Sequence, residues 1–207
     1  MGRPAGSNRN TRERLLEESA ALFSQVGYAA TSVKAIAKAV GIKDASIYNY
    51  FPSKEALFSE AMKREGRHFD EAMDRCGVFV DPATQRVVAE APSTLEGFED
   101  FLLRFWEPFF DDARVGRLRR MLVLGAPQSE EARGMLSTLF YDRPLGFAGA
   151  MVEHLSAAGA MAQCNSRVAA YEVCGPAIAM LGQDLAWPEA QRRLRSQYRA
   201  FSRAHAL

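Results

Sequence analysis

The chain has 207 residues, of which 48% are hydrophobic and 25% are charged, an ordinary composition for a folded globular protein. This composition excludes a collagen-like or intrinsically disordered chain, and no apolar run reaches the ~18 residues of a membrane-spanning helix. The first ten residues, MGRPAGSNRN, lack the apolar core of a secretory signal. We therefore expect a cytoplasmic protein with no membrane partner.

The three cysteines, Cys76, Cys164 and Cys174, lack the close spacing of zinc or redox sites, so we expect buried free thiols. The three histidines also lie far apart, and the sequence contains no Gly-x-Gly, Walker lysine, Gly-x-Ser-x-Gly or His-Glu-x-x-His motif. The sequence thus predicts no metal, no cofactor and no enzyme activity.

The net charge of +1 is unevenly distributed along the chain. Residues 1–54 hold eight Lys or Arg against four acidic residues, a balance of +4, whereas the remaining residues have a balance of −3. A basic N-terminal part on a slightly acidic remainder is the pattern expected when only that part approaches phosphates.

Helical periodicity dominates the chain and predicts an all-α fold. The first helix is expected to start at Asn10 or Thr11, with Asn10 and Glu13 as a capping box, and to end at Gly27. Its predicted inner face consists of Leu15, Ser19, Leu22, Phe23 and Val26.

Three further helices are predicted before residue 77. One starts at Thr31 or Ser32 and stops at Gly41, and a very short one follows within the stretch GIKDASIYNYF. The next begins at Ser53 and reaches about Cys76, a length of roughly 35 Å, enough to connect a head to a larger body.

The segment 77–92 has a poor pattern and is expected to be a loop with at most one helical turn. Ser93 and Glu96 form a second capping box, and Pro108 is expected to kink or end the helix that follows. Further helices are predicted at about 112–124, 129–141, 144–158, 166–186 and 188–205.

The short third helix carries an unusual exposed set. If Ile47 faces inward, Tyr50 and Phe51 fall on or beside the inner face, while Ala45, Ser46, Tyr48 and Asn49 point outward. The turn of about three or four residues that begins at Gly41 has the spacing of a helix-turn-helix, whose second helix lies in the DNA major groove.

Each outward residue suits a role at DNA. Ala45 allows close approach to a thymine methyl, and Ser46 and Asn49 can hydrogen-bond to bases or phosphates. Tyr48 and Tyr50 can donate phenolic hydrogens to phosphate oxygens, and Lys54 adds a charge beside free backbone N–H groups.

Residues 11–57, TRERLLEESAALFSQVGYAATSVKAIAKAVGIKDASIYNYFPSKEAL, resemble the DNA-binding head of the TetR family of bacterial transcriptional regulators. The resemblance implies a flexible basic arm at 1–9, a DNA-binding domain at 10–54, and a helical effector-binding and dimerisation domain at 55–207. Carried over by position, it implies DNA contacts from Thr31, Ser32, Lys34, Lys43, Asp44, Ala45, Ser46, Tyr48, Asn49, Tyr50 and Lys54.

Two of these predictions have alternatives. Lys43 stands where the family often has a cap residue, so Asp44 either caps the helix or accepts from a cytosine amine. The arm with Arg3 and Arg9 is either disordered or enters a minor groove.

The predicted body contains aromatic and flexible side chains that line an effector cavity or simply form the core. These residues are Phe98, Phe101, Phe105, Trp106, Phe109, Met121, Phe140, Phe147, Met151 and His154. His154 is the candidate polar contact, with a structural histidine as the alternative.

The last two helices are expected to form a four-helix dimer seam, as the family pattern implies, or to pack within one chain. The candidate interface residues are Tyr171, Gly175, Ile178, Leu194, Tyr198 and Phe201. The sequence thus predicts a homodimeric repressor released from a palindromic operator by an apolar or amphipathic effector. The alternatives are a DNA-bound architectural protein without an effector and an enzyme hidden in the helical body.

Overall fold

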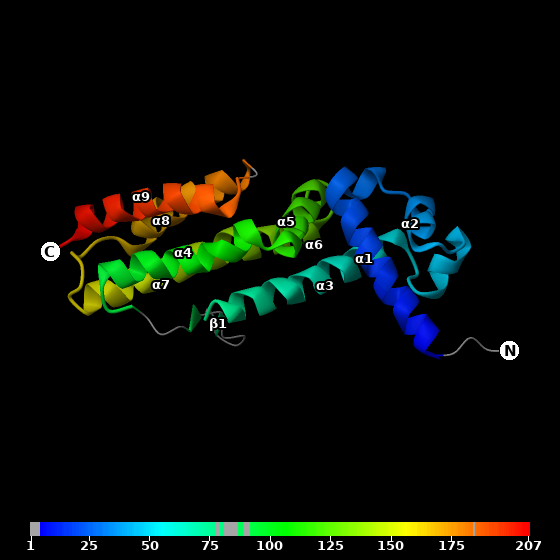
Figure 1. Ribbon diagram of the computed structural model, residues 1–207, viewed down its shortest axis with the longest axis horizontal. Coiled ribbons are helices and arrows are strands. Elements are labelled where there is room, and N and C mark those ends of the chain that lie inside the picture. Colours follow the sequence, from blue (N-terminus) through cyan, green and yellow to red (C-terminus); the bar gives the residue numbers. More distant parts are fainter. Residues whose placement is uncertain (1–4, 78, 81–86, 89–91, 184) are drawn as a thin grey trace. The chain divides into compact units, whose positions relative to one another are not determined.

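The computed structural model describes residues 5–77, 79–80, 87–88, 92–183 and 185–207, and these are almost entirely helical (Figure 1). This confirms the all-α fold predicted from the periodicity. The described chain forms two compact units. Unit 1 comprises residues 1–69 and 114–136, and unit 2 comprises residues 70–113 and 137–207. The predicted domain boundary at residues 54 and 55 stays a prediction.

Unit 1 begins with α1 (Ala5–Ala30), α2 (Val33–Val40) and the 3₁₀-helix η1 (Asp44–Asn49). Gly27 (φ 81°) is non-helical inside α1, and Gly41 (φ 77°) ends α2, which are the two breaks the sequence predicts. Ser32 caps α2 by accepting a hydrogen bond from the Ala35 N–H. These breaks fold α1, α2 and η1 around a shared core that includes Leu15, Phe23, Ile36 and Ile47.

The rest of unit 1 consists of the first part of α3 (Lys54–Arg75), α5 (Ala113–Gly125) and α6 (Glu130–Ser137). Phe58 and Met62 of α3 and Leu118, Met121 and Leu122 of α5 are buried. At Gly125, a Cβ atom would lie only 2.6 Å from the Phe58 ring, so this glycine allows α5 to approach α3 closely.

Unit 2 contains α4 (Leu95–Asp111), α7 (Arg143–Ala157), α8 (Ser166–Leu181) and α9 (Trp187–His205). α4 packs on α9, α7 packs on α8, and α8 packs on α9 (Figure 1). Two short strands, β1 (Phe79–Val80) and β2 (Val87–Val88), pair antiparallel. Much of the predicted 77–92 loop lies outside the described residues, and the strand pair was not predicted.

Several predicted helix ends are wrong. α1 begins at Ala5, so Asn10 lies inside the helix and does not cap it, and Val26 is 53% exposed although it was assigned to the inner face. α4 is capped by Thr94, whose side chain accepts from the Gly97 N–H, and Ser93 is not the cap. The prediction that Ser93 and Glu96 form its capping box is therefore off by one residue.

Pro108 lies inside α4, which continues to Asp111. Losing one backbone hydrogen bond there costs less than exposing the apolar side chains Phe105, Trp106 and Phe109, which are buried on the same helix. The helix predicted at 129–141 is α6 followed by a π-helical turn, η2 (Thr138–Asp142), and α8 ends at Leu181, before the predicted residue 186.

Within the described part of the chain, no helix is both long and apolar enough to cross a membrane. The same residues contain no group of three or more His, Cys, Asp or Glu side chains placed to hold a metal ion.

Candidate nucleic-acid interface

Two buried side chains fix η1 against α2. Ile47 is 1% exposed and Phe51 is 2% exposed, while Ile36, Ala37 and Val40 provide the buried face of α2. Gly41 donates its N–H to the carbonyls of Ala37 and Lys38, which closes α2 before the chain enters η1. The sequence pattern predicted this arrangement, in which the second element is short and held by its inner residues.

The opposite side of η1 faces outward. Ala45 and Asn49 are exposed, Ser46 and Tyr50 are half-buried, and Tyr48 is 56% exposed. A 3₁₀-helix places residues three apart on one line, so Ala45 and Tyr48 share one side of η1 and Ser46 and Asn49 share another. The exposed set therefore combines short hydrogen-bonding groups with one phenol.

The first turn of η1 shows how Asp44 is used. Its Oδ1 atom accepts a hydrogen bond from the N–H of the next residue, Ala45, at 3.0 Å, whereas a capping side chain accepts from an N–H two or three positions further on. Asp44 is the first residue of η1 and does not cap it, so the predicted capping role is wrong. The neighbouring Lys43 makes no side-chain cap. Both side chains are exposed.

Of the residues at the start of α2, Ser32 and Lys34 are exposed but Thr31 is buried. Thr31 is 2% exposed, and its hydroxyl donates to the Gly27 carbonyl at 2.7 Å. Thr31 therefore stabilises the bend after α1 and is withdrawn from the surface that would meet DNA.

Lys54 closes the end of α1. Its Nζ atom donates to the carbonyls of Tyr28 and Thr31 at 3.0 and 3.1 Å and lies 4.2 Å from the centroid of the Tyr28 ring. An ammonium group has three N–H donors, so one remains for a phosphate. The sequence predicted only the phosphate role for this lysine.

Tyr28 and Glu55 form a second link at the same point. The Tyr28 hydroxyl donates to Glu55 Oε1 at 2.5 Å. This bond lowers the pKa of Glu55 to about 2, while burial, followed by the same hydrogen bond, raises the pKa of Tyr28 to about 12. The pair keeps its present protonation state throughout the neutral range.

Two arginines of α1 also support the interface, and the sequence analysis did not assign them a role. Arg14 Nη2 donates to the Val40 carbonyl at 2.8 Å, and the Arg12 guanidinium lies 5.0 Å from the centroid of the Phe51 ring. Arg14 thus binds the C-terminal end of α2, where a positive charge is favourable. Arg12 also donates to Glu60 of α3, and the partners of neither arginine can be read from the pattern of α1 alone.

The predicted effector-binding residues are divided between the units. In unit 2, the rings of Phe105 and Phe147 stack with their centroids 4.6 Å apart, and Phe101 lies 5.2 Å from Phe147. Phe98, Trp106, Phe109, Phe140 and Met151 are buried as well. Met121 belongs to unit 1, and His154 is exposed on α7, so neither joins this aromatic cluster.

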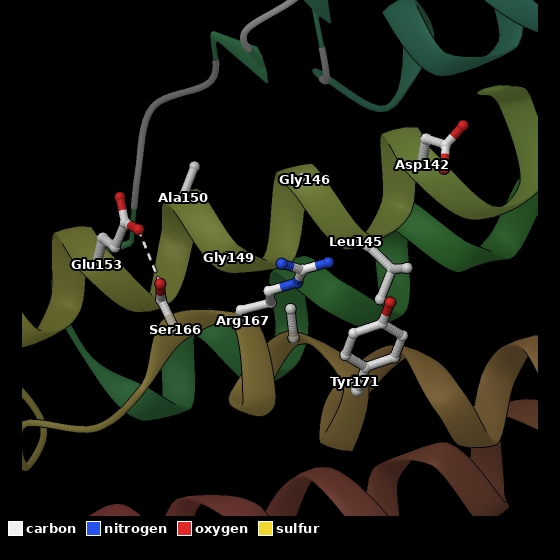
Figure 2. Close-up of a pocket in the computed structure, with 10 residues that line it drawn as sticks. Asp142, Leu145, Gly146, Gly149, Ala150, Glu153, Ser166, Arg167 and Tyr171 are labelled. Atoms are coloured by element: carbon white, nitrogen blue, oxygen red, sulfur yellow. Dashed lines mark hydrogen bonds between the residues drawn. The ribbon is translucent and has the colours of Figure 1, made fainter.

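The structure instead shows a surface groove of about 410 Å³ between α7 and α8 (Figure 2). Its lining residues are Asp142, Leu145, Gly146, Gly149, Ala150, Glu153, Ser166, Arg167, Ala170 and Tyr171. Figure 2 shows the Ser166 hydroxyl bonded to Glu153, at 2.8 Å, at one end of this groove. None of the predicted effector-binding residues lines it.

The predicted dimer-interface residues also divide into two sets. Leu194, Tyr198 and Phe201 of α9 are buried by packing within the chain, which is the alternative stated for them. On α8, Tyr171 is 55% exposed, and Gly175 and Ile178 are half-buried.

Comparisons with known proteins agree with this geometry. The family model described as bacterial regulatory proteins, tetR family, matches residues 15–61. The transcriptional repressor KstR of Mycolicibacterium smegmatis is 32% identical over 81 residues, a match that covers 39% of this chain and 40% of KstR. This chain thus spans about two fifths of the length of that curated relative.

Solved structures extend the similarity of fold over most of the chain. The regulator PfmR of Thermus thermophilus, described as TetR family, has a TM-score of 0.64 and 22% identity and matches over 93% of this chain and 95% of its own. A complex of SmeT with triclosan has a TM-score of 0.65 and 15% identity and covers 96% of this chain and 92% of SmeT.

Proposed function

We propose that this chain, which belongs to the TetR family of bacterial regulatory proteins, is a sequence-specific DNA-binding repressor that acts in the cytoplasm as a homodimer. A palindromic operator is the expected target, since a two-fold dimer presents two heads to half-sites about 34–36 Å apart or a multiple of that. Release by a small apolar or amphipathic effector completes the proposal.

The exposed side of η1 is the observation that carries this proposal. Ile47 and Phe51 anchor η1 to α2, which leaves Ala45, Tyr48 and Asn49 free to approach base edges and phosphates. Lys34 and Lys43 add positive charge on the same part of the chain, so binding is expected to weaken steeply with salt.

Selection from a pool of random duplexes tests the proposal. The wild-type protein should enrich one palindromic sequence, and Ser46→Ala should blur the preference at one base pair while keeping the others. Tyr48→Phe should weaken binding to every sequence. Its matched control is Tyr141→Phe, because Tyr141 is also an exposed tyrosine, at 41%, but belongs to unit 2. Wild-type protein that enriches no sequence in dilute buffer would refute the function.

The exposed side of α8 supports the homodimer. Val168 and Tyr171 are each 55% exposed, which is unusual for large apolar side chains on one helix. A two-fold symmetric contact between two copies of the chain across this side would bury Val168 and Tyr171 of each copy. Sedimentation equilibrium of the wild type and of a Val168→Glu variant should show a dimer and a weakened dimer, respectively.

The effector part draws on a protein of the same fold and on the core of unit 2. SmeT, a protein of the same fold, is known in complex with triclosan. In this chain, burial raises the pKa of Tyr198 and a contact with Trp106 opposes this rise, so the Tyr198 hydroxyl and Trp106 Nε1 form one polar position inside the apolar core of unit 2. Screening compounds for release of the selected duplex tests this part.

A second candidate is a DNA-bound regulator without an effector. The direct stacking of Phe105 on Phe147 in unit 2 favours it, because rings in contact leave no space for a ligand between them. A screen that finds no releasing compound, together with intact operator binding, would support this candidate.

A further inference from the structure

Unit 1 contains a cluster of charged side chains that joins α1, α3 and α5 and that the DNA contacts do not use. We call it the Glu65 cluster, and it consists of Glu13 and Glu17 from α1, Arg64 and Glu65 from α3, and Arg114 and Arg117 from α5. These six side chains carry three negative and three positive charges.

The carboxylate of Glu65 is the centre of the cluster, and its side chain is 0% exposed. Oε1 accepts from Arg64 Nη1 at 2.6 Å and from Arg114 Nη2 at 3.1 Å. Oε2 accepts from Arg117 Nη2 at 2.9 Å and from the Nε atoms of Arg114 and Arg117 at 3.2 Å. Arg114 therefore binds both oxygens of this carboxylate in a forked geometry, and Arg117 donates two N–H groups to Oε2, which fixes orientation as well as distance.

Two arginines extend the cluster to α1. Arg117 Nη1 lies 2.5 Å from Glu17 Oε1, and Arg64 Nη1 lies 2.8 Å from Glu17 Oε2. Arg64 Nε also donates to Glu13 at 3.3 Å. Arg117 thus connects α5 to both other helices, across 100 residues of sequence to Glu17 and 52 to Glu65.

The charges in the cluster depend on one another. Burial by itself would raise the pKa of Glu65, but the hydrogen bonds from Arg114 and Arg117 outweigh it and hold this pKa below its ordinary value. The Arg117 hydrogen bond likewise lowers the pKa of Glu17. Removing one partner from such a buried group leaves the other charges uncompensated.

Other contacts place α5 and α6 against the same helices. Leu124 of α5 lies near Gly27 of α1, where an added Cβ would be 3.4 Å from the Leu124 Cβ. The Ser59 hydroxyl of α3 donates to Glu131 of α6 at 2.9 Å. Residues 114–136 therefore belong to the same compact unit as the DNA-binding elements.

We infer that Glu65 is a positioning residue for DNA binding, which joins α5 to α1 and α3 so that the helix-turn-helix and α5 turn as one block. The inference rests on the proposed function. Any displacement of α5 is then passed to α1 through the bond between Arg117 and Glu17.

The test compares two duplexes, with the protein in each case the full chain. The first is the sequence selected by the wild type, and the second has a spacer lengthened by about two base pairs, which rotates one half-site by about 70°. A block of fixed orientation discriminates between them, whereas a loosened head adapts to both. The ratio of the two affinities is independent of the fraction of folded protein.

Glu65→Gln and Arg117→Gln are the test variants, and Glu60→Gln is the matched control. Glu60 accepts from Arg12 of α1 at 3.1 Å and so joins α1 to α3 without involving α5. We expect both test variants to lower the affinity ratio about fivefold or more, a typical size for coupling between sites. The control should keep the wild-type ratio.

Glu17→Gln is the second test if Glu65→Gln does not fold, because Glu17 is 44% exposed and its loss removes only the α1 end of the cluster. It should lower the ratio and speed amide hydrogen exchange in both α1 and α5. A folded Glu65→Gln or Glu17→Gln protein with the wild-type ratio would overturn the inference. Wild-type protein that selects no duplex would overturn the proposed function itself.

Discussion

Replacing Lys54 by methionine should destabilise unit 1 while keeping the apolar stem of the side chain. The substitution removes two hydrogen bonds from a charged donor, to the Tyr28 and Thr31 carbonyls, and the contact of the ammonium with the Tyr28 ring. Hydrogen bonds of this kind contribute about 1.5–3 kcal/mol each when buried, and an exposed cation–π contact about 0.5–1 kcal/mol.

The lower ends of these ranges add up to roughly 3.5 kcal/mol, and solvent replaces part of this because Lys54 is half-buried. We therefore expect the free energy of unfolding to fall by about 2–3 kcal/mol, which for a chain of this size lowers Tm by about 4–12 °C. Lys38→Met is the matched control, since Lys38 is exposed on α2 and should leave Tm unchanged.

Urea unfolding followed by far-ultraviolet circular dichroism measures the change in free energy. The salt dependence of binding to the selected duplex is measured on the same samples, because one phosphate contact contributes about 0.9 to its slope. A Lys54→Met protein with the wild-type unfolding midpoint would refute the structural role of Lys54. An unchanged salt dependence of binding would contradict the prediction that Lys54 contacts a phosphate.

Three further predictions concern the same helices. Gly41→Ala should destabilise the turn by about 1–2 kcal/mol through its positive φ alone, since no other atom lies within 4 Å of the added Cβ, and thermal unfolding measures this. Tyr48→Phe should weaken binding to every duplex sequence and leave Tm unchanged. A lowered Tm would show that the hydroxyl stabilises the folded protein instead of serving DNA binding. Because the pKa values of Glu17 and Glu65 are lowered in the folded protein, their stabilisation is present above about pH 4.5 and is lost as the pH falls through their folded pKa values. In acid titrations, the free energy of unfolding of Glu65→Gln should therefore fall less steeply below about pH 4.5 than that of the wild type. Equal slopes of the two curves would contradict this.

The local signals in the N-terminal third predict its fold well. Ser32 and Gly41 bound α2 as expected, and Ile47 and Phe51 are buried while Tyr48 is exposed. Short-range rules suffice here, because caps, positive-φ glycines and the inner face of a helix all depend on residues a few positions apart.

Contacts between distant segments were not predictable in this way. Thr31 was assigned to DNA, yet its hydroxyl meets the Gly27 carbonyl, and Lys54 meets two carbonyls at the end of α1. The partners of Glu65 are separated from it by up to 52 residues. One charged residue in a helical pattern looks like a solvated surface residue until its neighbours in space are known.

The body of the chain shows the same limit. Aromatic residues on α4 and α7 were grouped correctly as buried, but helical spacing does not tell whether rings line a cavity or stack on one another. His154, assigned to a pocket by its spacing from Met151, is exposed. Leu194, assigned to a dimer interface, is buried by packing within the chain.

Fluorescence anisotropy with the duplex enriched by selection tests the central claim most directly. The wild-type protein should bind it tightly and with steep salt dependence, and a double change of Tyr48→Ala and Asn49→Ala on the exposed side of η1 should abolish binding while leaving Tm unchanged. Equal affinity of wild type and double variant for the enriched duplex would show that η1 is not the surface that reads DNA.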